Sequence, residues 1–304
     1  MKEFLKKIVL FFFPIIFIFC GAEYILRHIP NDYSSKNNYL KQNGNEIEIL
    51  ILGSSHAYRG INPSYFDCTT FNAAYVSQTI DYDYFIFKKF EKELTSLETI
   101  VLTISPFTLY NQLQDGTESW RVKNYSIYYQ VPKKIESHLD FELTSMRSKV
   151  NFKRFYSYYL LKRTPNLSQE NGFKTFSLPQ LSQNEFVKSA REASERHNYK
   201  TLKRKKQNQN YINNIVQYGK KNGIDIVFVF PPVSEDYYSL IQENQKTETR
   251  SFIGGLVKSN DHLYSVDLTT NEMFQRDHFQ NADHLNKKGA EKLSSYLNEK
   301  ICVN

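Results

Sequence analysis

The hydrophobic pattern divides the chain into one long apolar run near its start and several short runs further on. The long run is uncharged over Ile8–Ala22, resumes after Glu23 and ends at Leu26. Residues 8–26 make 19 positions, close to the ~20 that a helix needs to cross a bilayer. Three lysines lie among the first seven residues, and positive charge before a span favours a cytoplasmic N-terminus. We therefore predict a membrane anchor over residues 1–27.

A cleaved signal peptide is the alternative interpretation of the same run. Its apolar core would be Ile8–Phe19, and Cys20–Ala22 would be a poor cleavage site. Both interpretations place the rest of the chain outside the cytoplasm. The polar residues 28–45 are expected to form a linker, which leaves residues 46–304 for the main domain.

The short apolar runs predict a parallel sheet. Five of them are typical of buried strands: Ile47–Leu52, Thr69–Ala73, Thr99–Ile104, Ile224–Phe230 and Leu263–Leu268. The intervening segments predict helices over Thr79–Leu94, Asn184–Asn222 and Asn286–Ile301. Strands that alternate with helices are typical of an α/β fold. We predict a three-layer sandwich with a central parallel sheet, and an N-terminal transmembrane helix in addition.

The middle of the chain interrupts this alternation. Residues from Thr108 to about Pro179 are aromatic, polar and irregular, and they include the only tryptophan, Trp120. We predict an insertion at about 108–180 over one edge of the sheet, partly helical around Phe152–Leu161.

Composition and charge narrow the class of protein. The chain has 304 residues, of which 40% are hydrophobic, too many for wholesale disorder. Its net charge of +7 suits an anionic membrane surface or an anionic polymer. The basic run Lys203–Lys206 is expected to be a solvated helix face, and no nucleic acid partner is expected for an exported domain.

The cysteines carry little information. Cys20, Cys68 and Cys302 show no zinc-type pairing. Cys20 lies in the long apolar run, so Cys68–Cys302 is the one disulfide open to the main domain, and nothing in the spacing supports it. We expect neither a metal nor a cofactor.

The candidate catalytic residues lie near the ends of predicted strands. Ser55 and Ser105 each follow a strand, and ligands of parallel sheets bind beyond the carboxyl ends of the strands. A serine is a weak nucleophile until a base takes its proton, and His284 could supply that base just before the last predicted helix. Ser54 is the neighbouring alternative nucleophile, and Asp277–His278 is an alternative acid–base pair.

Three segments near these residues form a recognisable set: Gly53–Ser55, Phe71–Ala74 with Ser77, and Asp283–Asn286 with Gly289–Ala290. Together they resemble the SGNH (GDSL-like) hydrolase superfamily over about Ile47–Ser105 and Ile224–Ile301. More narrowly, the chain looks like the membrane-anchored, extracytoplasmic branch that includes proteins of alginate O-acetylation and teichoic acid D-alanylation.

The resemblance implies that Ser55 is the nucleophile and His284 the base. Oxyanion or substrate contacts are expected at residues around the same edge of the sheet: His56, Asn72, Ser77 and Ser105.

The sequence departs from the family pattern at two places. The family usually has Asp three residues before the histidine, where this chain has Asn281, so either Asp283 or Asn281 would orient the imidazole. An asparagine can orient the ring but cannot stabilise its cation as a carboxylate does. The family's Gly-x-Asn-Asp is also absent after Ile104, where Ser105–Phe107 stands instead. An oxyanion donor is therefore missing there or comes from elsewhere.

Two functions from different classes follow from the sequence. The first is an extracytoplasmic, single-pass membrane enzyme, an O-acyltransferase or esterase that acts on a cell-envelope polysaccharide through an acyl-serine. A membrane-bound partner protein would bring its acyl donor. The alternative is a non-catalytic SGNH-like scaffold that binds polysaccharide or organises an envelope export or modification complex.

Overall fold

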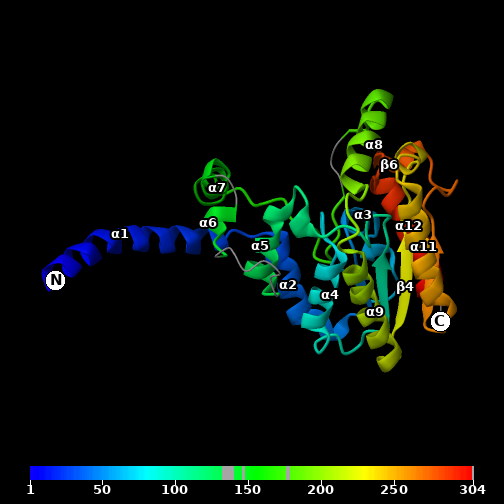
Figure 1. Cartoon of the computed structure of the whole chain (residues 1–304), viewed down its shortest axis with the longest axis horizontal. Coiled ribbons are helices and arrows are strands. Elements are labelled where there is room, and N and C mark those ends of the chain that lie inside the picture. The colour runs from blue at the N-terminus through cyan, green and yellow to red at the C-terminus, as the bar shows by residue number, and fades with distance from the viewer. Residues whose placement is uncertain (132–139, 146–147, 176–178, 303–304) are drawn as a thin grey trace. The chain divides into compact units, whose positions relative to one another are not determined.

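The computed structural model describes residues 1–131, 140–145, 148–175 and 179–302. Its chain divides into two compact units (Figure 1). The smaller unit comprises Met1–Ser35 and Ser119–Leu167, and the larger comprises Lys36–Glu118 and Ser168–Asn304. The larger unit holds the sheet and all the candidate site residues, and the smaller holds the apolar N-terminal helix.

The larger unit is built on a five-stranded sheet in which every neighbouring pair is parallel. The strand order is β2-β1-β3-β4-β5. The strands are β1 (Ile49–Leu52), β2 (Thr70–Asn72), β3 (Thr99–Thr103), β4 (Asp225–Phe230) and β5 (Leu263–Asp267). The five predicted strands are therefore confirmed, and each predicted boundary lies within two residues of the observed one.

Helices cover both faces of this sheet. They are α3 (Ser55–Gly60), α4 (Ile80–Phe90), α8 (Gln183–His197), α9 (Lys205–Asn222), α10 (Glu235–Tyr238), α11 (Glu243–Lys258) and α12 (Lys287–Ile301). On one face, Ile49, Ile51 and Val101 share a buried core with side chains of α3, α8, α10 and α12. On the other face, Gly219 of α9 lies against Ile226, and α9 packs on α4. The predicted α/β fold is confirmed.

One segment differs from the prediction, and a second contains a break that the sequence does not predict. The residues expected to form a polar linker contain α2 (Asp32–Asn43), where Leu40 is fully buried. The helical region predicted over Asn184–Asn222 consists of two helices, α8 and α9, with a break between them. The break is held by Gln245, whose side-chain amide donates to the carbonyl of His197 and accepts from the backbone N–H of Tyr199.

The C-terminal region adds a hairpin that the hydrophobic pattern does not predict. Strands β6 (Phe279–Asn281) and β7 (His284–Leu285) pair antiparallel, directly before α12. Asn286 caps α12 as predicted, because its side-chain oxygen accepts from the backbone N–H of Gly289. Short 3-10 turns complete this unit at Gly44–Glu46, Pro63–Tyr65, Leu113–Asp115 and Arg276–His278.

A disulfide joins Cys68 to Cys302, 234 residues apart in sequence. The spacing gave no support for this pair. Folding brings the two cysteines together, because the C-terminal end of α12 packs beside the segment that leads into β2. Cys20 is free and exposed on the N-terminal helix.

The smaller unit is dominated by α1 (Lys2–Arg27), a helix long and apolar enough to cross a membrane, a property that signal sequences share. Its other elements are a 3-10 turn (Ser119–Arg121), α5 (Val122–Asn124), the π-helix η5 (Tyr125–Tyr129), α6 (Glu142–Ser145), α7 (Ser148–Phe155) and the π-helix η6 (Tyr156–Leu160). Part of the predicted insertion therefore packs in the same unit as α1, and its expected helical stretch corresponds to α7 and η6.

Candidate active site

The first part of the candidate site is the turn that follows β1. Gly53 has φ +137°, and a Cβ built on it would lie 1.8 Å from the Thr103 hydroxyl oxygen. The turn needs glycine both for its backbone conformation and for this close approach. Ser54 is the N-cap of α3, and Ser55 is its first residue. The backbone N–H of Ser55 therefore belongs to the first turn, whose amides have no intrahelical partner.

Gly53→Ala is expected to destabilise the protein by about 3 kcal/mol, because it combines a strained backbone with a clash against Thr103. The matched control is Gly254→Ala on α11, where a new Cβ meets nothing within 4 Å and helix propensity favours alanine by about 0.5–1 kcal/mol. Urea unfolding of both variants in detergent measures the difference. Equal stability of the two variants would contradict this role of Gly53.

The buried carboxylate of Asp83 also stabilises this turn through a hydrogen bond. One oxygen of Asp83 accepts the backbone N–H of Gly53 at 2.8 Å and the side-chain amide of Gln78 at 2.7 Å. Burial raises the pKa of Asp83 to about 7, against these two hydrogen bonds. Asp83 therefore titrates in the folded protein near neutral pH, next to the Ser55 turn.

Asp83→Asn is expected to flatten the dependence of stability on pH. The folded-state pKa of Asp83 lies above its ordinary value of 3.8, so the native state binds the proton more tightly than the unfolded chain does. Stability from this group is therefore lost as pH rises from about 4 to about 7, by up to about 4 kcal/mol. The unfolding midpoint of Asp83→Asn minus that of wild type should therefore increase as pH rises from about 4 to about 7, because only wild type loses this stability. A constant difference would show that Asp83 does not titrate there.

The hairpin β6–β7 delivers the histidine. His284 is the first residue of β7 and pairs across the hairpin with Asn281. Its Nε2 lies 2.8 Å from the Oγ of Ser55, although the two residues are 229 positions apart. Both side chains are partly exposed. The structure thus brings together the serine and the histidine that the sequence singled out, with access from solvent.

The outer nitrogen of His284 meets both candidate orienting residues. Its Nδ1 lies 3.0 Å from Asn281 Oδ1 and 3.1 Å from Asp283 Oδ1. When Nε2 accepts the Ser55 proton, Nδ1 must carry a hydrogen, so Asn281 accepts it as a hydrogen bond. The Asn281 contact has hydrogen-bond geometry, and the Asp283 carboxylate lies at ion-pair distance from the same nitrogen. Asn281 is thus placed to accept the hydrogen of Nδ1, and the Asp283 carboxylate lies beside the same nitrogen.

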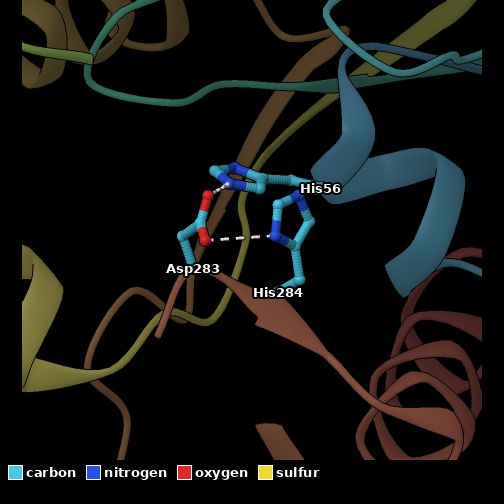
Figure 2. A group of neighbouring side chains, drawn as sticks. All are labelled: His56, Asp283 and His284. Atoms are coloured by element: carbon cyan, nitrogen blue, oxygen red, sulfur yellow. Dashed lines mark ion pairs between the residues drawn. The ribbon is translucent and has the colours of Figure 1, made fainter. Parts of the chain in front are cut away.

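Asp283 also faces a second imidazole. Its carboxylate faces the rings of both His284 and His56 from one side (Figure 2), with Oδ2 3.7 Å from His56 Nε2. The other ring nitrogen of His56 lies 2.7 Å from the Oγ of Ser105. Burial alone would raise the pKa of the Asp283 carboxyl, but the neighbouring histidines, His284 above all, hold that pKa well below its usual range. The carboxylate is thus ionised although it is only 1% exposed.

The other two histidines around Asp283 resist protonation. Burial lowers the pKa of His56 despite the nearby carboxylate. Burial also lowers the pKa of His197 to about 3, and its Nδ1 lies 2.7 Å from the Tyr237 hydroxyl. Both rings stay neutral at pH 7. The one negative charge of Asp283 is therefore available to an imidazolium that forms on His284.

Three of the predicted oxyanion or substrate contacts, Asn72, His56 and Ser105, have structural partners. The Asn72 side chain donates both amide hydrogens, to the carbonyls of Ala57 and Ile61, and accepts the N–H of Ala74. It therefore has no hydrogen left for an oxyanion. His56 and Ser105 are 4% and 2% exposed, so they lie behind the Ser55–His284 pair rather than at a substrate surface.

Ser77 is partly exposed and has a left-handed backbone, with φ 59°. In the described part of the chain it makes no hydrogen bond to Ser55 or His284. Its role as a substrate contact therefore stays a prediction.

Alternative residues weighed in the sequence fall outside this cluster. Asp277 pairs with Lys288, and His278 Nδ1 accepts the backbone N–H of Gln275. The Ser54 hydroxyl accepts the N–H of His56 at 3.4 Å as the cap of α3. Arg204 and Lys205 of the basic run pair with Asp115 and Glu248, the ion pairs expected of a solvated helix face.

The cluster also offers a donor set for a metal ion. Ligand atoms of His56, Asp283 and His284 lie within 4.8 Å of one another, and two imidazoles with a carboxylate suit zinc. A metal on His284 Nδ1 would leave the ring hydrogen on Nε2, so the ring could not take the Ser55 proton. Metal binding and activation of Ser55 would therefore compete. That the Ser55–His284 site functions without a metal ion stays a prediction.

The sequence did not point to His197 or Asp83. His197 is the last residue of a polar helix, and its place beside Asp283 depends on how α8 meets the hairpin. Asp83 lies in the first turn of α4 among aromatic residues. An acidic residue on the buried face of a predicted helix is the one signal that could have marked it.

Comparison with known proteins gives little further information. No family model and no curated protein matches the chain. Among solved structures, the chain is similar to "a putative platelet activating factor from Streptococcus pneumonia" with 10% identity and a TM-score of 0.44, over 94% of this chain and 98% of that chain. At this level of similarity we draw no functional conclusion from it. The function has to be inferred from the site.

Proposed function

We propose that the chain is an exported, membrane-anchored serine enzyme that cleaves or transfers acyl esters on a cell-envelope polysaccharide. The observation that carries the proposal is the 2.8 Å contact between Ser55 Oγ and His284 Nε2. It is supported by Asn281 and Asp283 at the other nitrogen of the ring. A nucleophile next to a base that is itself oriented by a third group is the arrangement that covalent acyl transfer needs.

The chemistry proceeds in two halves. Ser55 Oγ attacks the acyl carbonyl while its proton passes to His284 Nε2, and Asp283 stabilises the imidazolium. The backbone N–H of Ser55 donates to the developing oxyanion. When the ester bond breaks, His284 gives the proton to the departing alcohol and the acyl group stays on Ser55. In the second half, His284 Nε2 takes a proton from a sugar hydroxyl or from water, whose oxygen attacks the acyl carbonyl. The bond between the acyl carbon and Ser55 Oγ then breaks, His284 returns the proton to Ser55 Oγ, and the acyl group leaves on the sugar or as the free acid.

The acceptor and the location rest on the sequence. The resemblance to proteins of alginate and teichoic acid modification favours a polysaccharide, and the apolar α1 favours export with retention in the membrane. An anchored enzyme is suited to receive its acyl group from a membrane partner protein, so we favour transfer to a sugar hydroxyl over hydrolysis.

Reaction of the detergent-purified full chain with a fluorophosphonate tests the proposal. The account predicts rapid stoichiometric labelling, blocked by prior incubation with a small activated ester such as p-nitrophenyl acetate. A folded protein that neither labels nor hydrolyses the ester would favour the rival hypothesis of a non-catalytic scaffold. The scaffold also predicts that Ser55→Ala leaves acylation of the surface polymer unchanged.

A further inference from the structure

The smaller unit carries exposed apolar side chains outside α1. They lie on the continuous stretch formed by α7 and η6. Phe152 is 67% exposed, Tyr156 43% and Leu160 59%, with Val150 and Leu161 also exposed. The Phe152 and Tyr156 rings stack at 6.3 Å. Residues spaced by four on a helical segment share one side, so this stretch presents an exposed apolar face, which we call the α7 face.

The same stretch is bonded to the C-terminal end of α1. The Tyr159 hydroxyl donates to the carbonyl of Ile25. Glu23 accepts the backbone N–H groups of Glu142 and Leu143 at 2.7 and 2.9 Å, which ties α6 to α1. Figure 1 shows α6 and α7 beside this end of α1. The orientation of the α7 face is therefore set by its packing within the smaller unit.

This end of α1 corresponds to one edge of a bilayer. About 20 helical residues cross the hydrocarbon core, so a span that starts after Lys7 ends near Arg27. Ile25 and Glu23 then lie at the outer boundary, and the elements bonded to them lie at the same depth. An apolar face at that depth meets lipid rather than bulk water.

The charges around the α7 face suit anionic headgroups. Lys149 and Lys153 are exposed on the same helix, and Lys162 and Arg163 follow directly after it. Long basic side chains reach the headgroups while their stems lie along apolar surface. A helical segment with bulky apolar residues beside basic ones is typical of helices that lie in the membrane interface.

We propose that the α7 face lies in the outer surface of the bilayer as a second membrane contact, against anionic lipid. The inference does not depend on any catalytic activity. It rests on α1 being retained in the membrane, which the proposed function also assumes. The face would fix the orientation of the smaller unit about the axis of α1, which a single helix cannot do.

Quenching by brominated lipid tests this contact in the full chain. The only tryptophan is first removed by Trp120→Phe, and Phe152→Trp is then made in that background. Phe17→Trp, at a position 71% exposed on α1, reports separately whether α1 is in the bilayer. Each variant is placed in nanodiscs of anionic lipid, with bromine either near the headgroup or near the chain end, and unbrominated discs give the reference intensity.

We expect the Phe152→Trp variant to lose about half of its fluorescence with bromine near the headgroup, and less with bromine near the chain end, because interfacial helices lie only about 5–10 Å deep. Lys149→Glu with Lys153→Glu should reduce that quenching, and no reduction would overturn the role of anionic lipid. If the Phe152→Trp variant is not quenched while the Phe17→Trp variant is, the membrane contact is overturned and the anchor is left intact. A signal at 152 that depends only on protein concentration would assign the face to a second copy and overturn the proposal.

Discussion

Ser55→Ala is expected to abolish fluorophosphonate labelling and to lower ester turnover by about 10⁴-fold or more, since the nucleophile and its base act as one unit. The structure explains why no neighbour should substitute. The Ser105 hydroxyl is 2% exposed and faces His56, and the Ser54 hydroxyl accepts a backbone N–H as the cap of α3. Steady-state kinetics with p-nitrophenyl acetate measure the loss.

Ser54→Ala is the matched control for this prediction. It removes a hydroxyl one residue away and an N-cap, so it should cost about 1 kcal/mol of stability and less than about tenfold in activity, because that hydroxyl accepts only one long hydrogen bond. If Ser54→Ala rather than Ser55→Ala removed the labelling, the assignment of the nucleophile would be wrong.

Asp283→Asn is expected to lower kcat/KM for the same ester by about 10³-fold, because the imidazolium on His284 would lose its one buried negative charge. Asn281→Ala removes a neutral hydrogen bond to the same nitrogen and should cost about tenfold, the equivalent of about 1.4 kcal/mol. The two residues contact His284 Nδ1 at 3.1 and 3.0 Å, so the comparison separates charge from orientation.

The exchange variant Asp283→Asn with Asn281→Asp sharpens this test. It moves the carboxylate to the position that already accepts the Nδ1 hydrogen, and activity should return to within about tenfold of wild type if charge is what matters. A double variant as inactive as Asp283→Asn alone would mean that Asp283 acts through His56 or through folding. Thermal unfolding of each variant distinguishes those two causes.

The strands of the sheet could be predicted because burial restricts them to apolar residues. Ile49–Leu52 and Ile226–Phe230 are buried along nearly their whole length, so their sequences have to be apolar. The cap of α12 was predictable for a similarly local reason, since Asn286 needs only the N–H of Gly289 three residues later.

The helices that sequence reasoning missed bury polar side chains. In α11, Gln245 and Thr249 face inward and hydrogen-bond to His197, Tyr199 and Pro106. In α2, the buried Lys36 donates to the carbonyls of Asn72 and Ala74. The hydrogen-bonding groups of these buried side chains are paired with backbone groups far away in the sequence. Because the buried residues are polar, these helices lack the apolar periodicity that would have predicted them.

Part of the candidate site could be predicted from local features of the sequence. Ser55 and His284 were marked by their places at a strand end and before a helix, which are local properties. The choice between Asp283 and Asn281 could not be made from sequence, because the β6–β7 turn brings both to one nitrogen. The packing of His56 and His197 around Asp283 depends on α3 and α8 meeting that hairpin.

The proposed function depends above all on Ser55 as the covalent nucleophile. Peptide mass spectrometry of the fluorophosphonate-treated full chain tests it most directly, with fragmentation that distinguishes Ser54, Ser55 and Ser105. We expect one adduct, located on Ser55 and absent when His284 is replaced by alanine. An adduct on a different residue, or none on a protein that circular dichroism shows to be folded, would mean that Ser55 is not the nucleophile.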